Sequence, residues 1–331
     1  LEAMMPHLTE QYANASSVHA LGRRSRHVVE ESRERVAEHL GAGPGEIVFT
    51  SGGTEADNLA IKGVLAALPD ERPGLLTSRA EHKAVRDPAF RLRDRGLPVE
   101  LLAPDSAGRV DPDRLDAALT EREGEIGLVS LMYVNNELGT VNPVRDLAAV
   151  CRDHDVLLHC DAVQAPGFLP LDVEELGVDL LSLSAHKFYG PKGIGVLYAR
   201  GDLEIEPIVE GGGQERGRRG GTENVAAIVG LAEALGQLDP PDGETGRRIA
   251  GLRDRLLERI RRALDSEEFV VNTPLEEERC DRIDEGRGAR PAAAPHVLNL
   301  AFPPRNGEPV DGEMLLLNMD MKGICASNGS A

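Results

Sequence analysis

The 331-residue sequence has few cysteines and no long apolar segment. Its four cysteines form no C-x-x-C pair, and no cysteine and histidine cluster has the spacing of a zinc or iron–sulfur site, so we expect no bound metal. The sequence shows neither a signal peptide nor a stretch long enough to cross a membrane. Together with scattered cysteines, these absences predict a reduced, cytoplasmic protein that does not enter a membrane.

Positive charge is also scarce. Lysine and arginine number 37 against 56 acidic residues, a formal net charge of −19, and this balance disfavours a surface that binds nucleic acid directly. Only five of the basic residues are lysine. Arginine replacing lysine on an acidic surface resembles proteins that work in concentrated salt, where self-repulsion is screened. An ordinary acidic protein from a GC-rich genome is the alternative.

The few lysines limit the amines that could hold an aldehyde cofactor. They are Lys62, Lys83, Lys187, Lys192 and Lys322. Lys187 is the strongest candidate because it follows a histidine at the end of an apolar strand predicted at 180–184 and precedes a glycine-rich turn. A lysine becomes nucleophilic where burial or a neighbouring charge favours the neutral amine, as in a Schiff-base site. A solvated corner is the alternative interpretation of this His-Lys pair.

Two further segments indicate a ligand site. A short apolar strand predicted at 156–161 ends in Asp161, and a carboxylate there faces the crevice in which α/β proteins bind ligands. Pyridoxal phosphate needs such an acid against its ring nitrogen. Another strand, at 46–50, leads through Ser51-Gly52-Gly53-Thr54 into a helical pattern, which is typical of a phosphate cradle at a helix N-terminus. The spacing of a Walker loop is absent.

Six motifs appear in order along the chain, and they carry a family resemblance. They are S-G-G-T-E-A-D-N from Ser51, E-H-K-A-V from Glu81, V-N-N-E-L-G-T from Val134, D-A-V-Q from Asp161, S-A-H-K-F-Y-G-P-K-G from Ser184, and G-G-G-Q-E-R-G-R-R-G-G-T-E-N from Gly211. Together they resemble the cysteine desulfurases of the NifS/IscS type, which are pyridoxal-phosphate enzymes of aminotransferase class V. The resemblance runs from near Asn14 to the last residue.

The resemblance implies a role for each matching residue. Lys187 would form the Schiff base with the cofactor, Asp161 would contact the pyridine nitrogen, and His82 would stack on the ring and move protons. The remaining contacts would come from Gly53, Thr54, Ser184 and His186 to the phosphate, Gln164 to the phenolic oxygen, Asn136 near that oxygen and the substrate carboxylate, and Thr222 to the phosphate in the neighbouring subunit. The last contact implies a homodimer. As isolated residues, His82 could be an ordinary satisfied histidine and Asn135-Asn136 a turn.

The resemblance also implies an activity, the conversion of L-cysteine to L-alanine and an enzyme-bound persulfide. The sulfur would pass to an iron–sulfur scaffold protein or to a tRNA-thiolating enzyme. Alternatives are another class V activity, such as an aminotransferase or a selenocysteine lyase, and a non-catalytic paralogue that binds a sulfur-transfer partner. In the family, the persulfide-forming cysteine directly follows a Gly-Ser-Ala sequence, here Gly329-Ser330-Ala331, so we expect the nucleophile to be missing from these 331 residues. Cys325 is a weaker candidate for that role.

The predicted fold is α/β, a pyridoxal-phosphate transferase of fold type I with a mostly parallel sheet flanked by helices and a smaller α+β domain. Predicted strands and helices alternate, as such a sheet requires. The strands are at 46–50, 75–78, 126–133, 156–161 and 180–184, and the helices at 22–40, 54–67, 112–119 and 143–153. We expect a cofactor-binding domain at 1–240 and part of a small domain at 241–331, with a flexible surface insertion at 276–295.

Overall fold

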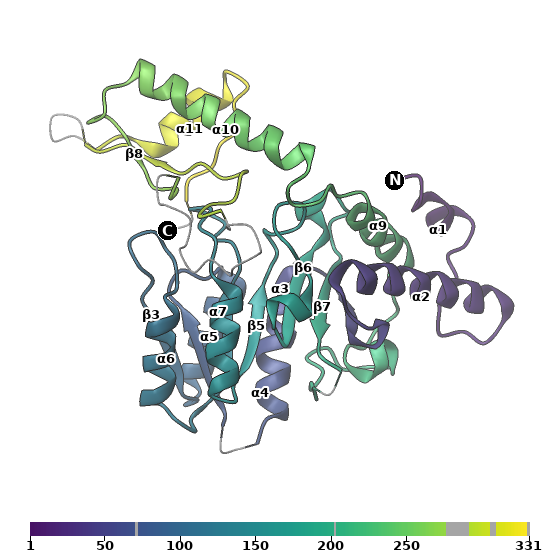
Figure 1. The fold of residues 1–331 in the computed structure, drawn as a ribbon. Coiled ribbons are helices and arrows are strands. Elements are labelled where there is room, and N and C mark those ends of the chain that lie inside the picture. Colours follow the sequence, from purple (N-terminus) through teal and green to yellow (C-terminus); the bar gives the residue numbers. More distant parts are fainter. Residues whose placement is uncertain (70–71, 202, 276–290, 305–308, 330–331) are drawn as a thin grey trace. The chain divides into compact units, whose positions relative to one another are not determined.

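The computed structural model describes residues 1–69, 72–201, 203–275, 291–304 and 309–329, which form two compact units (Figure 1). The first unit contains Leu1–Asn135 and Asn142–Pro241, and the second contains Asn136–Val141 and Asp242–Ala331. The short segment 136–141 therefore belongs to the second unit, although the residues on both sides of it belong to the first. The domain limits 1–240 and 241–331 remain a prediction.

A seven-stranded sheet forms the centre of the first unit. Its strands are β1 (Ile47–Thr50), β2 (Gly74–Ser78), β3 (Val99–Leu102), β4 (Ile126–Met132), β5 (Leu157–Asp161), β6 (Leu180–Ser184) and β7 (Gly195–Ala199), in the order β1-β7-β6-β5-β4-β2-β3. Among these described strands only β7 runs against the others, because it pairs antiparallel with both β1 and β6 while every other adjacent pair is parallel. The predicted α/β class with a mostly parallel sheet is confirmed.

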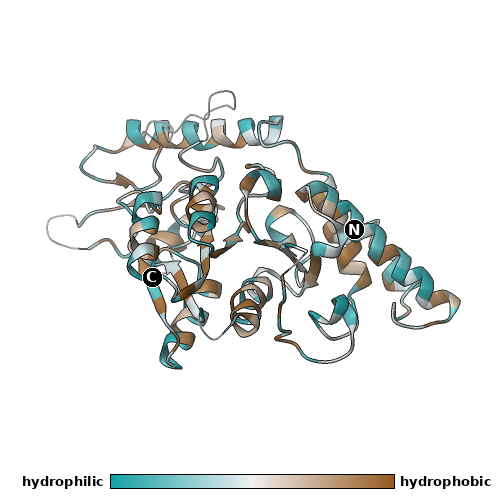
Figure 2. Ribbon diagram, turned by 60° about the horizontal axis from the view of Figure 1, so that its bottom comes forward, coloured by the Kyte–Doolittle hydropathy of each residue, from teal (hydrophilic) through white to brown (hydrophobic). Residues whose placement is uncertain are grey.

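Helices flank this sheet, and most of them bury one face. They are α1 (Met5–Thr9), α2 (Ala20–Leu40), α5 (Lys83–Asp94), α6 (Pro112–Glu121), α7 (Val144–Asp153), α8 (Val173–Leu176) and α9 (Val225–Gly236). In α2 the His19 side chain caps the first turn, Val29, Val36 and Leu40 are buried, and Gly41 ends the helix at a left-handed φ of 65°. Figure 2 shows the resulting separation of hydrophobic and hydrophilic residues on these helices.

One helical segment starts directly after β1 and is the one predicted at 54–67. It consists of α3 (Gly53–Asn58), a π-helical stretch (Leu59–Gly63) and α4 (Val64–Ala67). Gly63 closes the π-helical stretch, where an added Cβ would lie 2.5 Å from the carbonyl oxygen of Glu206. A π-helical insertion changes which side chains face the core, and such insertions occur mostly at functional sites.

The second unit contains α10 (Glu244–Ala263), α11 (Gly312–Asp320) and a two-stranded sheet of β8 (Val270–Val271) and β9 (Leu300–Ala301). The segment 136–141 joins this unit through a bridge between Thr140 and Ala293. The insertion expected at 276–295 falls largely outside the described residues. No described helix has the length and apolar content needed to span a membrane.

Candidate active site

The ends of four strands bring the predicted site residues of the first unit together. In the sheet, Gly195 of β7 pairs with Thr50 of β1 on one side and Ser184 of β6 on the other. Next along the sheet, Asp161 of β5 pairs with Ser182 and with Met132 of β4. Because β1, β4, β5 and β6 run in the same direction, the segments that follow them all emerge at one edge, where α/β proteins bind ligands.

The predicted phosphate cradle lies at this edge and requires glycine. Gly52 has a φ of 151°, which L side chains rarely adopt. At Gly53, an added Cβ would lie 2.8 Å from Cγ2 of Val163 and 3.3 Å from Cβ of Ser184. The backbone at 52–53 therefore approaches the end of β6 closely, which places Gly53 and the exposed Thr54 beside Ser184.

The lysine turn follows β6 as a short 3-10 helix, Ala185–Phe188. Phe188 is buried and anchors the turn, whereas Lys187 and His186 are exposed. The Nδ1 atom of His186 lies 3.0 Å from the hydroxyl of Ser184. Burial, followed by the positive charges of Lys187 and Lys192, lowers the pKa of His186, so the ring is neutral more readily than an ordinary histidine. A neutral ring carries one N–H donor, on either Nδ1 or Nε2.

Asp161 lies close to two predicted catalytic residues. Its Oδ1 accepts a hydrogen bond from the backbone N–H of Val163 at 3.0 Å. Burial raises the pKa of Asp161, while that hydrogen bond and the positive charges of His82 and Lys187 act in the opposite direction. His82 caps α5 by accepting the N–H of Ala84 through Nδ1 at 3.1 Å, and its ring is exposed.

The other three predicted residues have different positions. Gln164 follows the strand end by three residues and is half-buried, while Thr222 is exposed in the glycine-rich segment that follows residue 210. Asn136 belongs to the second unit. The structure therefore brings together the cradle, Ser184, His186, Lys187, Asp161 and His82, and the roles of Gln164, Asn136 and Thr222 stay predictions.

Two buried acids near Asp161, Glu81 and Asp57, were not predicted from the sequence. Glu81 accepts the N–H of Met132 through Oε1 at 3.1 Å, while its Oε2 has no hydrogen-bond partner among the described residues. Burial raises the pKa of Glu81 well above its ordinary value, the hydrogen bond from Met132 lowers it, and the charge of Asp161 raises it further. The pKa of Asp57 is also raised well above its ordinary value. Burial is the larger cause and the charge of Asp161 the next. Both lie inside quoted motifs, and nothing in their spacing signals burial.

A fully buried histidine of the sheet lies close to Asp57. His159 of β5 lies between the hydroxyl of Ser130, 2.8 Å from Nδ1, and the hydroxyl of Ser182, 2.9 Å from Nε2. Its Nε2 is 3.7 Å from Oδ1 of Asp57. Burial lowers the pKa of His159 to about 3, so the ring is neutral at physiological pH. The polar group formed by Ser130, His159, Ser182 and Asp57 thus contains no permanent positive charge.

The described cysteines divide into buried and exposed thiols. Cys151 and Cys160 are buried, and burial raises the pKa of both thiols, which disfavours the reactive thiolate. Cys325 is exposed, and Cys280 lies outside the described residues. No three His, Cys, Asp or Glu side chains in the described parts of the chain come together as metal ligands.

The comparison with known families decides the assignment. Residues 1–280 match the family described as aminotransferase class-V. The chain belongs to this family. It is 42% identical over 330 residues to "Cysteine desulfurase IscS" of Dictyoglomus turgidum, covering 100% of this chain and 77% of that relative. It is 42% identical over 331 residues to "Putative cysteine desulfurase IscS 1" of Bacillus subtilis, covering 100% of this chain and 81% of the relative.

Solved structures agree with this assignment. A "NIFS-LIKE PROTEIN" is 34% identical with a TM-score of 0.84, over 99% of this chain and 83% of that one. A structure described as "SspA in complex with cysteine" is 32% identical with a TM-score of 0.81, over 100% of this chain and 85% of that one. Both likenesses extend through the whole chain and include the site edge.

Pyridoxal phosphate is the cofactor of this family, and the residues at the sheet edge fit it. A phosphate needs backbone N–H groups and hydroxyls around a close backbone approach, which Gly53, Thr54 and Ser184 offer. An aldehyde needs an accessible amine, and Lys187 is exposed. A pyridine nitrogen needs a buried carboxylate, and Asp161 is 6% exposed.

Proposed function

We propose that this chain is a cysteine desulfurase that converts L-cysteine to L-alanine and an enzyme-bound persulfide. The observation that carries the proposal is the grouping of Lys187, Asp161 and the Gly53 cradle at one edge of the sheet. Two relatives named cysteine desulfurases, each 42% identical across the chain, supply the substrate class. The SspA structure, described as a complex with cysteine, supports the same substrate.

Each residue of the site has a separate task in this proposal. When bound, pyridoxal phosphate withdraws electrons from the substrate carbon. Lys187 would hold the aldehyde group of the cofactor, and the carboxylate of Asp161 would keep a proton on its ring nitrogen. His82, exposed and close to Asp161, would stack on the ring and move a proton to or from the substrate.

The phosphate is held at the cradle. Gly53 and Thr54 supply backbone N–H groups and a hydroxyl at the start of a helical segment, and Ser184 and His186 supply side-chain donors from the end of β6. By the resemblance, Gln164 would contact the phenolic oxygen of the cofactor, and Asn136 would lie near that oxygen and the substrate carboxylate.

The sulfur acceptor is an enzyme thiolate. That thiolate attacks the substrate sulfur, so that an S–S bond forms while the bond from Cβ to sulfur breaks, and the carbon keeps the electron pair and takes up a proton to give alanine. Cys151 and Cys160 are unsuited to this task because burial raises the pKa of both. Among the described cysteines, the exposed Cys325 stays the weaker candidate for this thiol.

The proposal extends to partners. Thr222 reaches the phosphate in a second copy, so the enzyme is a homodimer with two shared sites. The persulfide sulfur passes to an iron–sulfur scaffold protein or to a tRNA-thiolating enzyme in the cytoplasm.

The first prediction tests the lysine. Borohydride reduction of protein reconstituted with pyridoxal phosphate should fix the cofactor on Lys187, because Lys187 is the exposed amine whose charge reaches Asp161. Peptide mass spectrometry locates the adduct. Lys187→Ala should abolish the adduct and the visible absorption band, whereas Lys192→Ala, an exposed lysine of the same turn, should keep both. An adduct on Lys192 or Lys83 would overturn the assignment.

A further inference from the structure

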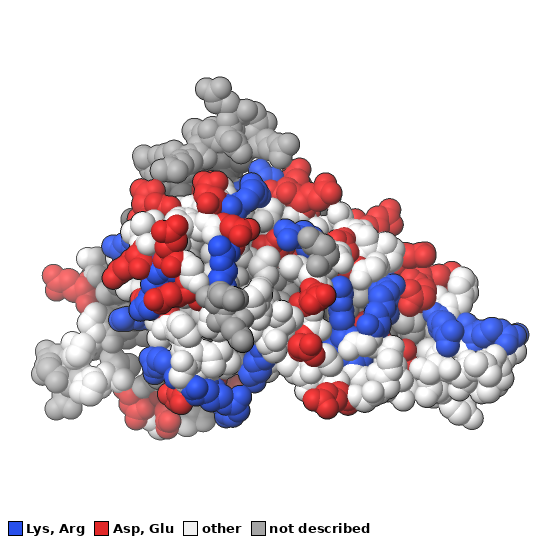
Figure 3. Space-filling model, turned by 90° about the horizontal axis from the view of Figure 1, so that it is seen from below, with Lys and Arg blue, Asp and Glu red and all other residues white. Residues whose placement is uncertain are grey.

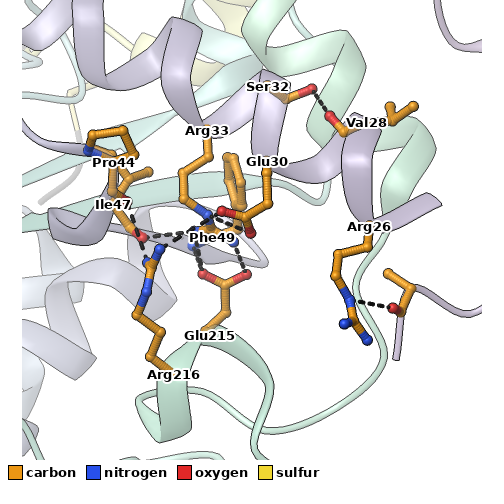
Figure 4. A network of polar contacts seen from close by, with 11 residues as sticks. Arg26, Val28, Glu30, Ser32, Arg33, Pro44, Ile47, Phe49, Glu215 and Arg216 are labelled. Atoms are coloured by element: carbon orange, nitrogen blue, oxygen red, sulfur yellow. Dashed lines mark hydrogen bonds and ion pairs between the residues drawn. The ribbon is translucent and has the colours of Figure 1, made fainter. Parts of the chain in front are cut away.

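The glycine-rich segment 211–221, here called the clamp loop, is attached to the strand that precedes the cradle. The attachment is Glu215, whose side chain is 3% exposed (Figure 4). Its carboxylate accepts hydrogen bonds from Arg33 at 2.8 and 2.9 Å and from the backbone N–H of Phe49 in β1 at 2.9 Å. Arg33 also donates to the carbonyl of Ile47 at 2.7 Å and lies over the ring of Phe49. One carboxylate thus joins the clamp loop, α2 and β1.

This attachment holds a backbone that would not adopt its conformation alone. Glu215 has a φ of 46° and Arg216 a φ of 57°, both in the left-handed region although neither is glycine. Such residues persist only where the surroundings enforce the conformation. The many glycines of the clamp loop add conformational freedom rather than order. The buried ion pair therefore serves to position the loop, since buried pairs contribute little net stability compared with apolar packing.

A second attachment reaches the cradle itself. The Nε atom of Arg219 donates to Oε1 of Glu55 at 2.8 Å, and Oε2 of Glu55 accepts the backbone N–H of Ser51 at 2.9 Å. Glu55 lies in the first turn of α3. Burial opposes its ionisation, but the hydrogen bonds from Arg219 and Ser51 outweigh burial and lower the pKa of Glu55, so the carboxylate is charged.

The two attachments contact the chain on either side of the cradle in the sequence. Glu215 binds at Phe49 and Arg219 at Glu55, while Ser51 to Thr54 lie between. We propose that the clamp loop sets both the shape and the charge of the cradle: Glu215 is a positioning residue for the backbone at 49–54, and Arg219 offsets the carboxylate of Glu55 so that a phosphate ester is preferred over an unphosphorylated ligand. This inference rests on the proposed function for the identity of that ester.

The effect of Arg219 on charge arises in the first turn of α3. A helix N-terminus attracts an anion, but a carboxylate in the same turn repels it at short range. With Arg219 paired, Glu55 and the guanidinium together carry no net charge. Removing Arg219 leaves one uncompensated negative charge beside the cradle, and this penalty applies only to a ligand that carries the phosphate.

The test compares two ligands on each variant. Apo-protein is titrated with pyridoxal phosphate and, separately, with pyridoxal, and the ratio of the two dissociation constants measures the preference for the phosphate. Arg219→Met should lower this preference about tenfold or more while changing the affinity for pyridoxal little. The double variant Glu55→Gln with Arg219→Met should recover it, because glutamine keeps an acceptor for Ser51 without the charge. Arg35→Met, which removes an exposed arginine that pairs with Glu233, is the control and should keep the full preference.

Glu215→Gln tests the positioning role by a separate measurement. It should expose the clamp loop to trypsin after Arg216 and Arg219 and lower the preference for the phosphate. Val36→Ala, which weakens the packing of the same helix α2 at a fully buried position, should leave the loop protected. Unchanged preference in Arg219→Met, or equal losses for both ligands, would overturn the inference. A wild-type protein that does not prefer pyridoxal phosphate would instead contradict the proposed function.

Discussion

At the scale of single residues, the site contains three buried carboxyl groups, of which the proposed chemistry needs only one in its charged form. Asp161 alone among them is close to the positive charges of His82 and Lys187. Glu81 and Asp57 are buried without such neighbours, and the charge of Asp161 raises the pKa of each further. Like charges in one buried site do not ionise together. We infer that Glu81 and Asp57 remain protonated and concentrate the negative charge on Asp161, the carboxylate proposed to meet the ring nitrogen.

A pH series on Glu81→Gln tests this inference. The native carboxyl stays neutral, whereas in the unfolded chain it ionises above its ordinary value of 4.5. The free energy of unfolding of the wild type therefore falls as pH rises from 4.5 toward the raised folded pKa. Glutamine does not titrate, so the variant does not show this fall. The free energy of unfolding of Glu81→Gln should improve relative to wild type by about 1.4 kcal/mol per pH unit in that window. Urea unfolding at several pH values measures it.

Glu81→Ala is the matched control because it removes the same proton but leaves a cavity. It should be less stable than Glu81→Gln at every pH, yet show the same pH slope. Parallel curves for wild type and Glu81→Gln would mean that Glu81 is ionised in the folded protein.

At the scale of elements, periodicity and turn chemistry predicted most of what surrounds the site. The five expected strands correspond to β1, β2, β4, β5 and β6, and the helix expected at 54–67 is present. No expectation was made for several elements, among them β3, β7, α5 and α9. The strand β7 follows a Pro-Lys-Gly turn that suggested only a loop, and α9 is apolar on nearly all sides, so it shows no amphipathic period.

The local contacts of the site were partly predictable as well. Lys187, Asp161 and Gly53 lie at strand ends, where sequence patterns indicate ligand sites. The pairs that join Glu215 to Arg33 and Arg219 to Glu55 span 182 and 164 residues, and no local pattern encodes such contacts. Burial of Asp57 and Glu81 depends on the packing of α3 and α5 against the sheet, which the sequence does not state.

Gly53→Ala tests the turn between β1 and α3. The added methyl would lie 2.8 Å from Val163 Cγ2, so it should cost about 1–3 kcal/mol of stability and weaken binding of pyridoxal phosphate by moving the cradle. Thermal unfolding and a cofactor titration measure the two effects. Gly251→Ala in α10 is the control: its Cβ meets nothing within 4 Å, and it should stabilise the helix by about 1 kcal/mol. Unchanged cofactor affinity in Gly53→Ala would show that the cradle does not require glycine.

At the scale of the whole molecule, the dominant property is charge. The sequence carries a formal net charge of −19. Figure 3 shows acidic and basic side chains interspersed over the face that it presents, so part of this charge is offset locally. Several ion pairs of the described residues are exposed, such as Arg35 with Glu233 and Arg262 with Glu258, and exposed pairs contribute about 1 kcal/mol at most. The excess of acids is therefore not neutralised within the chain.

We propose that the protein is adapted to a saline interior, and its response to salt tests the proposal. Self-repulsion destabilises a folded state with a large net charge, and the Debye length falls from about 10 Å at 0.1 M to about 3 Å at 1 M. The melting temperature should therefore rise substantially between low salt and molar KCl. The rise per unit of added salt should be steepest at the low-salt end, where the Debye length shortens fastest. Sucrose at matched osmolality is the control and should not reproduce that concentration dependence, because it screens no charge. A melting temperature that stays flat or falls in KCl would favour an ordinary acidic protein, since the exposed ion pairs would then lose more to screening than the acidic surface gains.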